Sequence, residues 1–208
     1  MIKCIIFDCD GTLVDSEYLC NLGFEIKLKE YGVHFPAQQI MEKHVGSKLA
    51  GIMASFESEF GIKLKEDFVS SYRAIVAELF KERLTACDGV HEMLSSINLP
   101  KCVASNGPLE KMTMALTLSG LIEHFQGHLF SAYEVGSWKP DPGLFLEVAN
   151  VMGFKAEQCA VVEDSLVGLV TAKAAGMFAI LYDPHNIHNE LPDTLRISHM
   201  DQLLDSIS

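Results

Sequence analysis

Residues 5–15 read Ile5-Ile6-Phe7-Asp8-Cys9-Asp10-Gly11-Thr12-Leu13-Val14-Asp15. The short apolar run stops abruptly at Asp8, which is typical of a buried strand in an α/β sheet. Asp8 then stands at the edge where open α/β sheets bind ligands. Asp8 and Asp10 are close enough to repel each other, and a divalent cation in front of them would offset that repulsion. A polar turn without chemistry is the alternative. A calcium loop is disfavoured because residues 12–14 supply apolar groups where that loop needs oxygens.

Three further segments carry reactive side chains. The apolar run Lys101-Cys102-Val103-Ala104 leads to Ser105-Asn106-Gly107. A second run, Cys159-Ala160-Val161-Val162, leads to Glu163-Asp164-Ser165. Between them lies Ser137-Trp138-Lys139-Pro140-Asp141-Pro142.

In type, order and spacing these four motifs match those of the haloacid dehalogenase-like hydrolase superfamily, and the chain resembles that superfamily over its whole length. The matching residues are Asp8 and Asp10, Ser105, Lys139, and Glu163 and Asp164. Within that superfamily it is similar to the phosphatase and phosphomutase branch, whose members carry an inserted helical cap. The segments 105–108, 138–142 and 183–186 resemble those of bacterial 6-phosphogluconate phosphatases.

Composition agrees with a compact soluble enzyme. The chain has 208 residues, of which 49% are hydrophobic, enough for one sizeable core and a small second domain. The net charge of −12 argues against binding to nucleic acids or to anionic membranes. The apolar run before Asp8 is too short for a signal-peptide core, so we expect a cytoplasmic protein. We expect it to be a monomer or a weak homodimer.

The cysteines also fit a cytoplasmic protein. The chain has six, at positions 4, 9, 20, 87, 102 and 159, and none forms a Cys-x-x-Cys pair. They are typical of small core residues in a reducing environment, and they indicate neither disulfides nor a zinc site.

The pattern along the chain predicts two domains. Residues 16–84 show helical periodicity and no convincing strand, with helices expected at about 16–31, from Pro36, at 47–60 and at 64–83. From about residue 86 strands and helices alternate, which predicts a doubly wound parallel sheet with a Rossmann-like core. The strands are expected at 101–105, 128–132, 159–163 and 177–182, and the helices at 88–98, 108–119, 142–152, 165–175 and 200–206. The domains are therefore an α/β catalytic core, 1–15 and 85–208, and a helical cap, 16–84.

The resemblance implies a phosphatase that works through an aspartyl phosphate. Asp8 would be the nucleophile, and Asp10 the general acid and then the base that activates water. Lys139 would neutralise Asp8 and the phosphoryl group; a plain surface lysine is the alternative. A halide leaves without a proton, so the presence of Asp10 favours phosphoryl transfer over dehalogenation. The resemblance also implies a cis Lys139–Pro140 bond.

The implied cofactor is Mg²⁺, which prefers oxygen ligands. Asp8, the backbone carbonyl of Asp10, Glu163 and Asp164 are the expected ligand set. Which of Glu163 and Asp164 contacts the metal directly is left open, and one of them could instead only cap the helix that follows.

Substrate-binding residues are expected in both domains. In the core we expect Thr12, Ser105 and the amide of Asn106, the last two at the start of a helix whose dipole favours anions. Ser105 could equally be a plain helix cap. In the cap, Gly46-Ser47-Lys48 resembles the substrate loop of small sugar-phosphate enzymes, and Arg73 could clamp a carboxylate; solvated helix-face roles are nearly as plausible for Lys48 and Arg73.

The expected substrate is a small phosphorylated sugar or sugar acid, with 6-phosphogluconate favoured. Phosphoglycolate is an alternative substrate. A β-phosphoglucomutase-like mutase is disfavoured because Cys20 stands where that branch carries a histidine. A catalytically inactive interaction protein on the same fold is the alternative of another class. His185 and His188 are expected in a solvated loop, since no further ligand has metal-binding spacing nearby.

Overall fold

The computed structural model describes residues 1–44, 47–188 and 194–207. Gly46 of the expected substrate loop lies outside these described residues. The chain divides into two compact units, one formed by residues 1–15 and 85–208 and the other by residues 16–84. The first is called the α/β unit below, and the second the helical unit.

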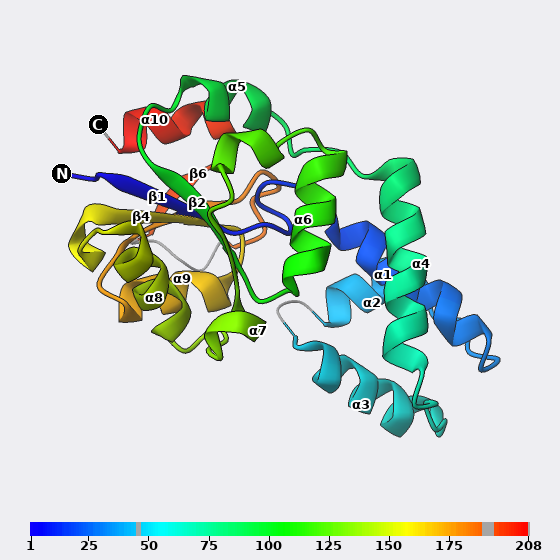
Figure 1. The fold of residues 1–208 in the computed structure, drawn as a ribbon. Helices are drawn as coiled ribbons and strands as arrows, with labels where there is room; N and C mark the ends of the chain where they lie inside the picture. The colour runs from blue at the N-terminus through cyan, green and yellow to red at the C-terminus, as the bar shows by residue number, and fades with distance from the viewer. Residues whose placement is uncertain (45–46, 189–193, 208) are drawn as a thin grey trace. The chain divides into compact units, whose positions relative to one another are not determined.

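The α/β unit is built on a parallel sheet of six strands, in the order β3-β2-β1-β4-β5-β6 (Figure 1). The strands are β1 (Cys4–Phe7), β2 (Lys101–Ser105), β3 (Leu129–Ser131), β4 (Cys159–Glu163), β5 (Phe178–Tyr182) and β6 (Leu195–Ile197). The central strands β1 and β4 are buried along their whole length, which explains the unbroken apolar runs 4–7 and 159–162. The expected doubly wound sheet is confirmed.

Helices cover both faces of this sheet (Figure 1). On one face α8 (Gly143–Met152) and α9 (Leu166–Ala174) pack against the alternate strand residues that include Ile6 and Val161. On the other face lie α5 (Val90–Ser96) and α6 (Leu109–Leu118), and Phe7 meets Phe125 edge to face with ring centroids 6.2 Å apart. The carboxyl ends of β1, β2 and β4 therefore share one edge of a rigid, covered sheet.

The shortest elements of the α/β unit differ from expectation. Helix α7 (Ala132–Val135) and strand β6 were not expected. Both span too few residues for a periodic pattern, and β6 is an edge strand with an arginine at its centre. The remaining short elements are η1 (Ile122–Phe125), η2 (Ala156–Gln158), η3 (Met200–Gln202) and α10 (Leu203–Ser206).

The helical unit contains α1 (Glu17–Lys29), α2 (Ala37–Lys43), α3 (Leu49–Phe60) and α4 (Phe68–Arg83). Its core is aromatic: Phe24 stacks on Tyr72 with ring centroids 4.1 Å apart and meets Phe56 edge to face at 5.4 Å. Gly23 on α1 allows the close approach of α4, because a Cβ there would lie 2.6 Å from Val76. The described residues of this unit contain no strand.

Helix α4 starts four residues later than its sequence suggests. The backbone N–H of Leu64 donates to Glu57 Oε1 at 2.9 Å, and that of Lys65 donates to the Tyr31 hydroxyl at 3.1 Å. A helix that began at residue 64 would leave these backbone N–H groups without acceptors in its first turn. Here side chains from neighbouring segments accept from them instead. The expectation of a helix from residue 64 was wrong for this reason.

Among the described helices, none is both long and apolar enough to cross a membrane.

Candidate active site

The loop after β1 places two carboxylates at the end of the sheet. The Asp8 N–H still donates to Val162 O at 2.9 Å, so Asp8 continues the edge of β1 beside β4. The chain then turns tightly, with the N–H groups of Leu13 and Val14 both donating to Cys9 O at 3.0 and 3.1 Å. Gly11 has φ +77°, and a Cβ there would overlap the Asp164 carboxylate. The glycine of this Asp-x-Asp-Gly sequence is therefore required by the turn and by the neighbouring Asp164 carboxylate.

Lys139 is the cation at the centre of this edge. It is only 3% exposed, and its Nζ donates to Asp8 Oδ1 and Glu163 Oε1, both at 2.5 Å, and to the carbonyl oxygen of Ala104 at 2.9 Å. The same ammonium lies 5.0 Å from the centroid of the Phe145 ring. The bond between Lys139 and Pro140 is cis, as expected. Lys139 is therefore no surface lysine but a buried charge held by three acceptors.

Burial and crowding shift the protonation of this pair. Burial raises the pKa of Asp8, and the nearby charges of Glu163 and Asp10 add to that effect while Lys139 opposes it; the result is a pKa of about 7. For Lys139, burial lowers the pKa, but the charges of Asp8 and Glu163 outweigh burial and raise it above its usual value. The lysine therefore stays charged, and the carboxylate cluster has an excess of negative charge.

A cation could be held by the acidic cluster of Asp8, Glu163 and Asp164. One oxygen from each residue lies within 4.8 Å of the others, and the donors are all carboxylates, the type that Mg²⁺ prefers. Glu163 is fixed by Lys139 and by the Ser165 hydroxyl, which donates to Oε2 at 2.8 Å. The residues present therefore fit a divalent cation. The carboxylate of Asp10 is not part of this cluster, and a role for its backbone carbonyl stays a prediction.

Thr12 lies beside the acidic cluster. It is fully buried, and its hydroxyl donates to Asp164 Oδ1 at 3.1 Å. A buried hydroxyl with this partner orients the carboxylate, and the expected contact of Thr12 with a substrate stays a prediction.

Ser105 and Asn106 form the loop between β2 and α6. Ser105 Oγ accepts the N–H of Gly107 at 3.0 Å, and Ser131 Oγ, at the end of β3, donates to the Gly107 carbonyl at 2.7 Å. The side chain of Asn106 accepts the Lys139 N–H at 2.9 Å and donates to the Lys139 carbonyl at 3.3 Å. The Asn106 side chain therefore holds the lysine turn, and only its backbone amide is left for the expected contact with substrate.

Two residues near these carboxylates were not predicted from the sequence to contact the site. Lys111 on α6 donates to both oxygens of Asp10, at 2.8 and 2.9 Å. The His188 ring nitrogen Nε2 lies 3.0 Å from the carbonyl oxygen of Asp164, so His188 is not simply solvated, while His185 is exposed as expected. The signal for Lys111 was its place on the first turn of the helix that follows Ser105; nothing in the sequence pairs His188 with Asp164.

Lys48 and Arg73 belong to the helical unit. Lys48 is the residue before α3, Arg73 lies on α4, and both are exposed. Their expected contact with a substrate stays a prediction.

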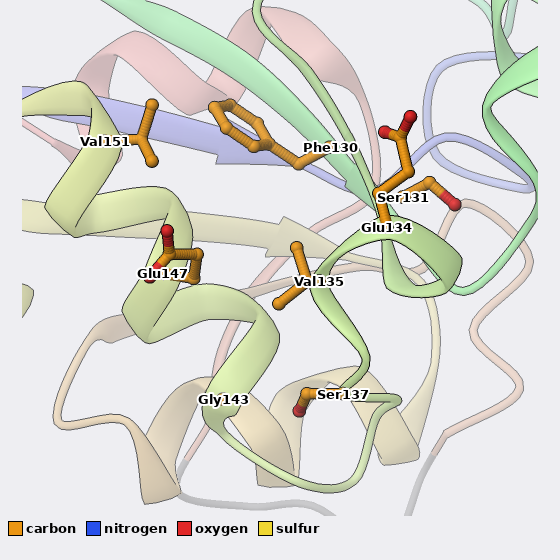
Figure 2. A pocket seen from close by; sticks show the side chains of 8 residues that line it. All are labelled: Phe130, Ser131, Glu134, Val135, Ser137, Gly143, Glu147 and Val151. Atoms are coloured by element: carbon orange, nitrogen blue, oxygen red, sulfur yellow. The ribbon is translucent and has the colours of Figure 1, made fainter.

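A pocket of about 450 Å³ lies elsewhere in the α/β unit, between β3, α7 and α8 (Figure 2). Phe130 and Val135 form part of its wall, and the charged side chains that line it are those of Glu134 and Glu147. Among the residues that the structure describes, no basic residue lines this pocket, and none of the lining residues is a site residue predicted from the sequence. It is therefore unsuited to a phosphate dianion.

A family model for haloacid dehalogenase-like hydrolases matches residues 2–176. The chain belongs to this family. It is 37% identical, over 205 residues, to the 6-phosphogluconate phosphatase of Escherichia coli, an alignment that covers 97% of this chain and 93% of the relative.

Solved structures agree with this family assignment. A conserved haloacid dehalogenase-like protein of unknown function from Agrobacterium tumefaciens matches with a TM-score of 0.86 at 32% identity, covering 100% of this chain and 98% of that one. A family hydrolase from Deinococcus radiodurans, solved with bound phosphate and sodium, matches with a TM-score of 0.78 at 25% identity, covering 99% and 95%. The haloacid dehalogenase-like fold, and the expected class of enzyme, a phosphomonoester hydrolase, are confirmed.

Proposed function

We propose that this haloacid dehalogenase-like hydrolase is a Mg²⁺-dependent phosphatase of a small phosphorylated sugar or sugar acid, with 6-phosphogluconate the favoured substrate. The observation that carries the proposal is the arrangement at the end of β1: Asp8 faces the buried ammonium of Lys139, and Asp10 stands beside it with a separate partner. The choice of substrate is supported by 37% identity, over nearly the whole chain, to a relative named for that activity.

In the first step a carboxylate oxygen of Asp8 attacks phosphorus, and the bond between phosphorus and the sugar oxygen breaks. Asp10 gives its proton to the departing alkoxide, which leaves as the alcohol. The product is an aspartyl phosphate on Asp8, which divides one difficult hydrolysis into two easier steps. Lys139 holds Asp8 in place and keeps positive charge beside the incoming phosphoryl oxygens.

In the second step water attacks the phosphorus of the aspartyl phosphate. Asp10, now ionised, takes the proton from that water, and the bond between phosphorus and Asp8 breaks. Phosphate leaves, and Asp8 is again a free carboxylate. Ser105 and the backbone amide of Asn106 would bind phosphoryl oxygens, where the start of α6 favours an anion.

The carboxylates of Asp8, Glu163 and Asp164, with the carbonyl of Asp10, would hold the cation. When bound, Mg²⁺ supplies positive charge that offsets the repulsion between the carboxylates and a phosphate dianion. Thr12 keeps one oxygen of Asp164 in a fixed direction. Lys139 and Ser165 do the same for Glu163.

We propose the helical unit as the cap that selects the substrate, with Lys48 and Arg73 near its carboxylate. Two chain segments link the units, and they are joined within the α/β unit: Asp15 N–H donates to Thr85 O, and Cys87 N–H donates to Leu13 O, both at 3.0 Å. Paired links of this kind suit a hinge that opens for substrate and closes to exclude water.

Phosphate release from a panel of phosphorylated sugars, sugar acids and phosphoglycolate, measured with and without Mg²⁺, tests the proposal. We expect hydrolysis only with the cation, and the highest kcat/KM for 6-phosphogluconate. A higher kcat/KM for phosphoglycolate would make phosphoglycolate the favoured substrate in place of 6-phosphogluconate. The absence of any phosphomonoester hydrolysis would contradict the function itself.

A further inference from the structure

Asp10 has a basic partner that belongs to none of the four motifs. Lys111 lies in the first turn of α6, and its Nζ donates to Asp10 Oδ1 at 2.8 Å and to Oδ2 at 2.9 Å. The two residues are 101 positions apart in the sequence, so the contact depends on the way the sheet and α6 are assembled. The carboxylate is therefore held through both of its oxygens.

Asp8 and Asp10 thus have separate lysines with different surroundings. The Asp8 partner, Lys139, has a side chain that is 4% exposed, while the Lys111 and Asp10 side chains are 28% and 30% exposed. The buried pair suits a group that stays in place. The partly exposed pair suits a group that meets both the departing alcohol and the incoming water.

The same lysine also borders the loop that would bind phosphate. A Cβ at Gly107 would lie 3.3 Å from Ser105 Oγ, 3.9 Å from Asp10 Oδ2 and 4.0 Å from Lys111 Cδ. These three side chains therefore surround one small space beside Gly107. Lys111 therefore lies beside both Asp10 and the loop that would bind phosphate.

We propose that Lys111 is a positioning residue for proton transfer: it holds the Asp10 carboxylate in the direction needed to protonate the leaving alkoxide and then to accept a proton from water. This inference rests on the proposed function of Asp10. An ammonium group has three donors, so Lys111 can keep one oxygen of Asp10 while the other transfers the proton. Misplacing a catalytic group by even 1 Å can reduce the rate about 100-fold.

The pair contributes little to folding, which makes the proposal testable by substitution. Ion pairs that are partly exposed to water contribute little to the free energy of unfolding. Lys111→Met keeps most of the apolar stem and removes the charge, and Lys111→Arg restores a donor. Lys173 on α9, whose exposed Nζ donates to the Thr194 hydroxyl at 3.1 Å, provides the matched control Lys173→Met.

The experiment compares kcat/KM for two substrates with Mg²⁺ present: 6-phosphogluconate, or the best alkyl phosphate of the panel, and 2,4-dinitrophenyl phosphate. The alkyl oxygen needs a proton to leave, whereas dinitrophenolate leaves without one. General acid catalysis is worth about 100- to 10,000-fold. We expect Lys111→Met to lower kcat/KM at least about tenfold for the alkyl phosphate and less than about threefold for the aryl phosphate, through kcat more than KM.

Two further variants complete the test. Lys111→Arg should recover part of the loss. Adding Lys111→Met to Asp10→Asn should cause little further loss, because Lys111 acts through Asp10. Equal losses on both substrates, a change confined to the KM of the sugar acid, or no change at all would overturn the proposal. An unmodified protein that hydrolyses neither substrate would instead contradict the proposed function, and the inference with it.

Discussion

Lys139 Nζ lies 2.5 Å from Asp8 Oδ1 at the end of β1, and the same ammonium also meets Glu163 at 2.5 Å. One buried cation therefore holds two carboxylates that come from neighbouring strands. Asp10 and Asp164 add further negative charge at this edge. Part of this negative charge remains uncompensated. It explains why the site would bind a divalent cation, and why Asp8 binds a proton when no cation is present.

The metal-free protein should lose stability as the pH rises from about 4 to about 7, because of Asp8. Its pKa is about 7 in the folded protein against 3.8 normally, so the folded state holds this proton more tightly than the unfolded state. The contribution of this proton to the free energy of unfolding is complete below pH 4 and is lost as the pH rises through 7. The free energy of unfolding changes by on the order of 4 kcal/mol. Urea unfolding in chelator, comparing the protein with Asp8→Asn, measures it. Parallel pH curves for the two proteins would exclude this cause.

Chelation should remove the phosphatase activity, and Mg²⁺ should restore it. The oxygens of Asp8, Glu163 and Asp164 lie close enough together to repel a phosphate dianion when no cation is bound. Activity is measured in excess chelator and again after titration with Mg²⁺, and cation binding is followed by calorimetry. Full activity in chelator would contradict the metal assignment, and so would binding unchanged by Asp164→Asn.

Gly168→Ala should weaken Mg²⁺ binding and reduce kcat/KM about tenfold or more. A Cβ at Gly168 would overlap the Glu163 carboxylate, which must then move away from Lys139 and from the metal position. Gly51→Ala is the matched control, since both glycines are helical and nothing lies within 4 Å of a Cβ at Gly51. The control should keep full activity and gain up to about 1 kcal/mol of stability. Unchanged Mg²⁺ affinity in Gly168→Ala would argue against a role for Glu163 in holding the cation.

Lys48→Ala or Arg73→Ala should lower kcat/KM for 6-phosphogluconate roughly tenfold or more, the worth of about one charge-assisted hydrogen bond. Hydrolysis of an aryl phosphate should change much less, because it has no carboxylate to hold. Lys63→Ala, another exposed cation of the helical unit, is the control and should leave both substrates unaffected. Equal losses on both substrates would mean that Lys48 and Arg73 support the cap and do not read the sugar acid.

The sheet was predictable because its strands are buried on both faces and appear as continuous apolar runs ending in Asp8, Ser105 and Glu163. Strand β6 was not, because three residues at an edge carry no such run. The start of α4 depends on acceptors supplied by Glu57 and Tyr31, which a local pattern cannot contain.

The site was predictable only where a motif carries its chemistry within a few residues. Lys111 reaches Asp10 across 101 positions, and His188 reaches the Asp164 carbonyl across 24. Thr12 and Asn106 belong to the motifs, but their side chains turn to Asp164 and to the Lys139 backbone. These partners are set by the packing of α6 and of the loops at the sheet edge, so only the structure could show them.

Covalent labelling of Asp8 tests the central claim most directly. The protein is mixed with 6-phosphogluconate, or with the best substrate of the panel, labelled with ³²P in the phosphate, and quenched in acid within milliseconds. We expect labelled protein whose label is released by hydroxylamine, as an acyl phosphate requires, and peptide mapping should place it on Asp8. Asp8→Asn should carry no label, keep its fold, and lose activity at least about 1,000-fold. Label on another residue, or appreciable turnover by Asp8→Asn, would contradict the account.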